Sequence, residues 1–118
     1  SHNQMETMKD PSAHAELLCI RKGSEFFGDW RLIDTVLYTT LEPCLMCAGA
    51  IFLARIKKVV WGARDIRHGA NGSFVDVFEK KYPTHNVVIE GGVRSIESGQ
   101  LMRGFFKKRR EEVSKKLK

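Results

Sequence analysis

The sequence is organised around one stretch, Glu42-Pro43-Cys44-Leu45-Met46-Cys47-Ala48-Gly49-Ala50. It contains two cysteines separated by two residues, and the tripeptide His14-Ala15-Glu16 stands upstream of it. On a helix that turns about 100° per residue, Cys44 and Cys47 lie on nearly the same side, and Pro43 suits the first helical position. Both thiols would then lie at the positive end of a helix dipole, which favours the thiolate form that binds metal ions.

His14 and Glu16 supply the other half of the pattern. Because they are two residues apart, they point about 200° away from each other on the body of a helix. Both can therefore face one ion only from the first turn of a helix, where side chains project past its end. Asp10 is expected to be the N-cap of that helix, with Pro11 at its first position. The sequence thus predicts two helix N-termini that meet at one metal ion.

The inventory of ligands indicates a catalytic metal. Structural zinc sites use four protein ligands, whereas catalytic sites use three and leave one position for water. Cys44, Cys47 and His14 make three, and no fourth ligand stands at a motif-like spacing from them. Glu16 would then move protons between that water and the substrate. The alternative is a redox or structural Cys-x-x-Cys with His14 as an ordinary core residue of a helix.

Together these motifs resemble a known family. An upstream His-x-Glu with Pro-Cys-x-x-Cys is the signature of the zinc-dependent nucleobase deaminases. Within that superfamily, the chain is most similar to the bacterial-type tRNA-specific adenosine deaminases. The zinc motif by itself indicates only a deaminase, whereas the other segments point to the tRNA branch. The segments that carry the resemblance are His2-Asn3, residues 10–16, 37–44, 47–51, 61–65, 69–73 and 105–110.

The resemblance implies a fold and a reaction. The implied fold class is α/β, a three-layer α/β/α cytidine-deaminase-like fold with a central mixed sheet, in one domain over residues 1–118. The implied reaction is the hydrolytic deamination of adenosine to inosine at the wobble position of a tRNA anticodon, with zinc-bound hydroxide as the nucleophile. It also implies one zinc per subunit, held by His14, Cys44 and Cys47, with Glu16 as the catalytic residue.

The resemblance further implies partners and substrate contacts. The partners would be a tRNA anticodon stem-loop and a second copy of the chain in a cytoplasmic homodimer, with no membrane. The loop 63–82 would supply walls of the nucleotide pocket. The implied substrate-binding residues are Asn3, Ala15, Leu41, Pro43, Asp65, Phe106 and Arg109.

The start of the chain departs from the family pattern. It begins Ser1-His2-Asn3, where the resemblance places the end of a strand, whereas family members carry a helix and a β-hairpin before this point. We therefore expect an N-terminally truncated version of the fold.

Composition limits the remaining choices. A chain of 118 residues with 42% hydrophobic content can bury one core. No apolar run is long enough for a membrane span or a secretory signal. Free cysteines at metal-binding spacing suit a reducing cytosol. Cys19, which stands among Leu17, Leu18 and Ile20, is expected in the core.

Hydrophobic periodicity and chain breakers predict helices and strands in alternation. A strand, a helix and another strand in succession predict parallel pairing, which places the metal at the carboxyl end of a strand. A short helix is expected from about Phe74, and His68 is not expected to bind the metal. The other expected elements are helix 11–24, strand 33–40, a metal-binding helix that continues to Arg55, strand 57–62, strand 87–89 and helix 95–116.

Positive charge is concentrated in the last helix. Residues 103–118 contain eight Lys or Arg and two Glu, a surplus equal to the whole formal charge of +6. With Phe105 and Phe106 beside these cations, the pattern predicts an arm that binds phosphates and presents an aromatic surface to unstacked bases. The alternative is a solvated amphipathic helix end whose phenylalanines are core.

Three other functions fit parts of this pattern. A deaminase of free cytidine, guanine or deoxycytidylate would use the same zinc ligands but has less need of a basic terminus. A non-catalytic RNA-binding subunit would hold a structural zinc, and the presence of Glu16 argues against it. A purely structural zinc module is disfavoured by the missing fourth ligand.

Overall fold

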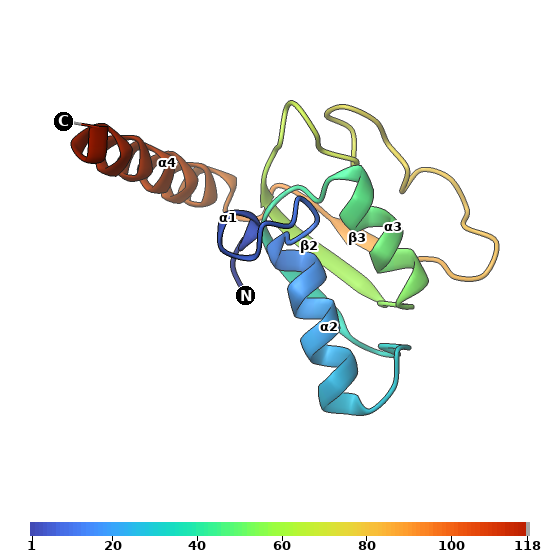
Figure 1. Cartoon of the computed structure of the whole chain (residues 1–118). Helices are drawn as coiled ribbons and strands as arrows, with labels where there is room; N and C mark the ends of the chain where they lie inside the picture. The colour runs from blue at the N-terminus through green and yellow to red at the C-terminus, as the bar shows by residue number, and fades with distance from the viewer. Residues whose placement is uncertain (118) are drawn as a thin grey trace.

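The computed structural model describes residues 1–117, with side chains as far as Lys115, and within them the chain forms four helices and a three-stranded sheet. The elements are α1 Met5–Met8, α2 Ala15–Phe27, β1 Val36–Leu41, α3 Leu45–Leu53, β2 Lys58–Ala63, β3 Val88–Glu90 and α4 Ser95–Leu117 (Figure 1). None of these described helices is both long and apolar enough to cross a membrane.

The sheet has the order β1-β2-β3, and both neighbouring pairs are parallel, with Leu37 opposite Val59 and Val59 opposite Ile89. The predicted parallel pairing across the metal-binding helix is confirmed, because α3 connects β1 to β2. The antiparallel strand that a mixed sheet requires is not among residues 1–117. Since α3 follows β1 directly, its N-terminus lies at the carboxyl end of that strand, where sites in α/β folds form.

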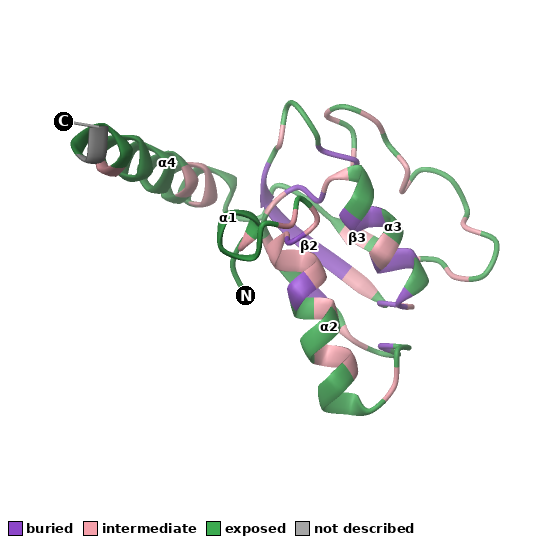
Figure 2. Ribbon diagram, in the orientation of Figure 1, coloured by how far each residue is buried: buried purple, intermediate pink, exposed green. Residues whose placement is uncertain are grey.

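The core lies between the sheet and α2 and α3. Successive side chains of a strand face opposite sides of a sheet, so Leu37, Val59 and Trp61 share one face. They pack with Ile51 of α3, which is fully buried, and with residues of the connecting loops (Figure 2). The other members of this buried cluster are Leu32, Ala54 and Ile56.

The opposite face of the sheet is covered only in part. The first half of α4 packs there, near the carboxyl ends of β1 and β2. The Thr40 hydroxyl donates to the Met102 sulfur at 3.7 Å, and Ser98 occupies the space where a side chain on Gly62 would be. Tyr38, on the same face as Thr40, keeps 73% of its surface exposed. The predicted last helix is confirmed, and its second half runs away from the sheet (Figure 1).

The helix that carries Glu16 begins later than predicted. It starts at Ala15 because the Asp10 carboxylate accepts hydrogen bonds from the Ser12 N–H and hydroxyl (2.8 and 2.7 Å) and so closes a separate turn. The expectation that Asp10 caps a helix beginning at Pro11 was therefore wrong. The helix ends at Gly28, whose φ of 66° is left-handed.

Two further expectations were wrong. No helix forms from Phe74, because the Val77 N–H donates to the Ala70 carbonyl at 3.0 Å and the chain folds back on the preceding loop. Cys19 is exposed, although its neighbour Leu18 is buried. Cys19 lines a solvent-accessible cavity beside β1, together with Leu37 and residues around Glu16.

Candidate metal centre

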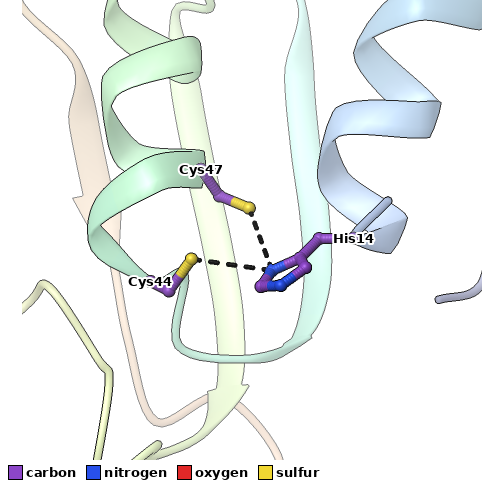
Figure 3. A group of neighbouring side chains, drawn as sticks. All are labelled: His14, Cys44 and Cys47. Carbon is purple, nitrogen blue, oxygen red and sulfur yellow. Dashed lines mark hydrogen bonds between the residues drawn. The ribbon is translucent and has the colours of Figure 1, made fainter. Parts of the chain in front are cut away.

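Two helix N-termini meet at three side chains (Figure 3). His14 is the N-cap of α2, Cys44 is the N-cap of α3, and Cys47 lies in the first turn of α3. The α3 helix begins at Leu45, two residues after the expected start at Pro43. The Nδ1 atom of His14 lies 3.6 Å from each cysteine Sγ, and all three ligand atoms lie within 4.8 Å of one another.

This geometry fits zinc. With Zn–S near 2.3 Å and Zn–N near 2.05 Å, tetrahedral coordination places sulfur and nitrogen ligands about 3.6 Å apart. The two observed S–N separations equal that value. Among the residues that the structure describes, the group contains three ligands, so a fourth position would be open to water. A donor set of two thiols and one imidazole also matches the ligand preference of this ion.

The two thiols differ in their affinity for a proton. The hydrogen bond donated by Cys47 lowers the pKa of Cys44 to about 5, assisted by the backbone N–H groups of Cys47 and Met46 and by His14. The same hydrogen bond, with burial and the nearby Glu16 carboxylate, raises the pKa of Cys47 well above its usual range. Metal ligation requires thiolates, so binding of the ion would release the protons that the pair holds.

Glu16 lies beside the metal ligand Cys47. It is the second residue of α2 and half-buried, and its carboxylate is close enough to Cys47 to raise the pKa of that thiol. Together with Ala15 it lines the cavity between α2 and β1. The carboxylate thus lies next to one of the metal ligands and at the edge of a cavity.

Asn3, predicted to bind substrate, holds the start of α2. Its side-chain oxygen accepts the Ala15 N–H at 2.8 Å, which leaves the amide NH2 group as its donor. Pro43 is fully buried, and its carbonyl accepts the Ala70 N–H at 2.8 Å. Leu41 is the half-buried last residue of β1. The structure therefore gathers Asn3, Ala15 and Pro43 around the two helix N-termini that carry the metal ligands.

The other predicted substrate-binding residues lie later in the sequence, in the loop after β2 and on α4. Asp65 is in the loop after β2, where its carboxylate accepts the His68 N–H at 3.3 Å. The side chain of His68 is 71% exposed and does not belong to the metal group. Phe106 and Arg109 are on α4, where Arg109 pairs with Glu112 at 3.0 Å. Within the described residues, neither forms a hydrogen bond or ion pair with a metal ligand.

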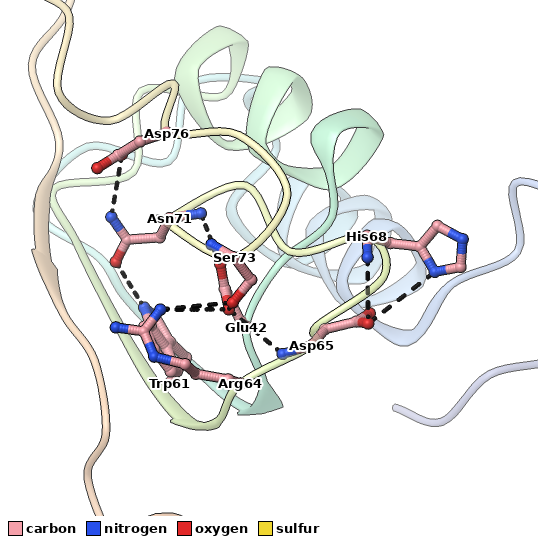
Figure 4. A network of polar contacts seen from close by, with 8 residues as sticks. All are labelled: Glu42, Trp61, Arg64, Asp65, His68, Asn71, Ser73 and Asp76. Atoms are coloured by element: carbon pink, nitrogen blue, oxygen red, sulfur yellow. Dashed lines mark hydrogen bonds and ion pairs between the residues drawn. The ribbon is translucent and has the colours of Figure 1, made fainter.

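Sequence reasoning missed a role for Glu42. Its side chain is fully buried and binds the loop after β2, which also contains Asp65 (Figure 4). The available signal was an acidic residue between a strand and Pro43-Cys44, with glycines in the following loop. That pattern does not say which segment the carboxylate binds, because its partners are more than twenty residues away.

Replacing Cys44 by Ala is expected to abolish zinc binding, because two remaining ligands do not hold the ion against solvent. The zinc content per chain, measured by elemental analysis after exchange into metal-free buffer, checks this result. Cys19→Ala is the matched control, and its zinc content should equal that of the unmodified chain. Zinc retained at one per chain in Cys44→Ala would show that the ligand set is wrong.

Comparison with known proteins agrees with this site. Residues 1–110 match the family described as MafB19-like deaminase. The chain is 46% identical over 103 residues to a tRNA-specific adenosine deaminase of Haemophilus influenzae, and the match covers 87% of this chain and 60% of that protein. It is 39% identical over 112 residues to a tRNA-specific adenosine deaminase of Bacillus subtilis, with 95% of this chain and 70% of that protein covered.

A solved structure from studies of A-to-I editing by tRNA:A34 deaminases at the wobble position of transfer RNA confirms the expected fold. It matches this chain with a TM-score of 0.78 at 40% sequence identity, over 85% of this chain and 72% of that one. The resemblance on which the fold prediction rested is thereby confirmed. The chain belongs to the MafB19-like deaminase family and to the family of the tRNA-specific adenosine deaminases.

Proposed function

We propose that this chain carries out the hydrolytic deamination of adenosine to inosine at the wobble position of a tRNA anticodon, with one zinc ion per subunit. The observation that carries the proposal is the group of His14, Cys44 and Cys47 with Glu16 beside it. The names of the relatives support the same substrate. The chain spans 60% of the length of the Haemophilus influenzae protein.

The mechanism assigns the proton transfers to Glu16. When bound, zinc lowers the pKa of a coordinated water and so supplies the nucleophile near neutral pH. The Glu16 carboxylate would accept a proton from the attacking water and deliver it to the ring nitrogen N1 as the water oxygen adds to C6 of adenine. A second proton passes through Glu16 to the exocyclic amine, which leaves as ammonia. Water and adenosine are thus converted to inosine and ammonia.

The basic half of α4 supports an RNA substrate. Lys107, Lys108 and Arg110 are exposed, so their charges are available to phosphates, whereas the exposed Arg109 also pairs with Glu112. Phe105 and Phe106 are 53% and 46% exposed, which excludes the alternative that they are core residues. The bases of an RNA loop are already unstacked, which lowers the cost of placing one in a catalytic pocket. Lys116 and Lys118 lie outside the residues whose side chains are described.

The outer faces of α2 and α3 support a homodimer. Between them lies an apolar groove that exposes Trp30 (57%) and Leu53 (59%), with Ile20 and Ala50 in its lining. The Arg55 guanidinium lies over the Trp30 ring at 5.6 Å. Exposed apolar patches with Trp and Arg are typical of protein interfaces, and we assign this one to a second copy of the chain. Free thiol ligands and a tRNA substrate both suit the cytoplasm.

Replacing Glu16 by Ala is expected to leave about one zinc per chain and to lower turnover by roughly 10²–10⁴-fold, the usual contribution of a general acid–base group. The assay is inosine formation on an anticodon stem-loop with adenosine at the wobble position, with zinc measured on the same sample. Glu25→Ala, at an exposed position of the same helix, should retain full turnover. Full turnover in Glu16→Ala would contradict the assigned role.

Replacing Lys107 and Lys108 together by Gln is expected to weaken stem-loop binding. It should also make the dependence of log affinity on log salt shallower by about 0.7 to 0.9 for each lost phosphate contact. Fluorescence anisotropy over a salt series measures both quantities. The double variant of Arg21 and Lys22 to Gln, which are exposed on α2, is the matched control. If both double variants weaken binding equally, α4 contributes only to the overall positive charge of the protein. If neither weakens binding, the result favours a deaminase of a small substrate.

Replacing Leu53 by Glu is expected to convert a homodimer to single chains, because a charge would be buried in the apolar groove. Sedimentation equilibrium gives the mass directly. Val113→Glu, at a 50% exposed site on α4, should leave the mass at two chains. A mass of one chain for the unmodified protein would contradict the dimer.

A further inference from the structure

Glu42 is a buried carboxylate at the junction between β1 and the metal-binding helix. Only 2% of the residue is exposed, and Pro43 and Cys44 follow it directly. Its two oxygens accept four hydrogen bonds, and every donor belongs to the loop 65–73 (Figure 4). The donors are the N–H groups of Asp65 (3.3 Å), Asn71 (2.8 Å) and Ser73 (3.3 Å) and the Ser73 hydroxyl.

The same loop lies against the first turn of the metal-binding helix. The Ala70 N–H donates to the Pro43 carbonyl at 2.8 Å, and Gly69 forms a β-bridge with the metal ligand Cys44. A side chain at Gly69 would overlap the Glu42 carboxylate, so the loop backbone approaches as closely as glycine allows. The loop is therefore attached to Cys44 by its backbone and to Glu42 by the carboxylate.

Asn71, whose N–H donates to Glu42 at 2.8 Å, is also held by its side chain. The Trp61 indole N–H donates to the Asn71 side-chain oxygen at 2.8 Å, and the Asn71 amide NH2 group donates to Asp76 at 3.3 Å. Arg64 lies 3.9 Å from Glu42, but its side chain is 56% exposed. Most hydrogen-bond donors to the carboxylate are therefore backbone N–H groups of the loop, and these groups have the carboxylate as their acceptor.

The chemistry of the partners requires a carboxylate at this position. An ionised carboxylate is acceptor-only, so both of its oxygens can receive N–H and O–H donors. A glutamine at position 42 would replace one of the two oxygens by an NH2 group, which would face N–H or O–H donors of the loop. An apolar residue would leave buried N–H groups without partners, which is costly. Burying a charge is also an expensive means of stabilising a core, which favours a role in fixing geometry.

We propose that Glu42 is a positioning residue, whose carboxylate holds the loop 65–73 against Pro43 and Cys44 and so fixes the substrate side of the metal centre. The inference rests on the proposed function, because the family resemblance assigns Asp65 and its loop to the pocket that binds the target nucleotide. The three metal ligands lie outside the loop. Loss of the carboxylate should therefore release the loop without releasing the metal.

The test is the zinc-loaded Glu42→Gln variant, which keeps the shape of the side chain. Amide hydrogen exchange, followed by NMR, should become at least about tenfold faster at Asp65, Asn71 and Ser73, with Val59 unchanged, because only the loop opens. Zinc should remain near one per chain. The KM for the anticodon stem-loop should rise by about tenfold or more, with a smaller change in kcat, because a displaced loop loses contacts to bound RNA.

Val59→Ala is the matched control, because it weakens the core at the far end of β2 from the loop. It should leave the three loop amides and the KM unchanged. Ser73→Ala removes one donor, keeps the backbone N–H and should give a smaller effect in the same direction. If Glu42→Gln does not fold, Ser73→Ala provides the test.

The outcomes separate this proposal from the proposed function. Unchanged exchange at the three amides, or a rise in KM equal to that of Val59→Ala, would overturn the positioning role. If the unmodified chain forms no inosine, its affinity for the stem-loop replaces KM. In that case, faster loop exchange in Glu42→Gln with unchanged affinity for the stem-loop would also overturn the positioning role. Faster exchange with weaker stem-loop binding would support the positioning role, although the deaminase function had failed.

Discussion

The structure depends on holding one imidazole nitrogen and two sulfurs at the spacing of zinc ligands. His14 and Cys44 occupy N-cap positions, where the backbone is extended and the side chain projects past the helix end. Two helices can therefore supply ligands to one point only if their N-termini meet. The parallel pairing of β1 and β2 arranges this, because it places the start of α3 at the carboxyl end of β1. The Asn3 side chain fixes the start of α2 from the other side.

The electrostatics of the site follow from this meeting of helix ends. N-terminal N–H groups stabilise negative charge, and Cys44, which the Cys47 thiol and backbone N–H groups contact, has the lowered pKa. The hydrogen bond to Cys44, burial and the Glu16 carboxylate raise the pKa of Cys47. The same closeness that raises the pKa of Cys47 places the Glu16 carboxylate beside the ligands. One arrangement thus serves both metal binding and the proposed proton transfer.

The segments that we propose to contact the substrate are attached to this centre to different degrees. The loop 65–73 is held closely, through four hydrogen bonds to Glu42 and a β-bridge to Cys44. The basic half of α4 extends from the body, with its cations and both phenylalanines exposed (Figure 1). A firmly held loop suits selection of one base, whereas a projecting charged helix suits less specific attraction of phosphates.

The sequence by itself determined the ligand types, the parallel strand–helix–strand unit and the basic last helix, because ligand identity, periodicity and charge are local properties of the chain. It predicted the meeting of two helix N-termini but misplaced the start of α2, since Asp10 closes a turn over Ser12. Only the tertiary structure decided that Cys19 is exposed and that Glu42 is buried beneath the loop 65–73. These outcomes depend on which distant segments pack together, and no local pattern specifies that.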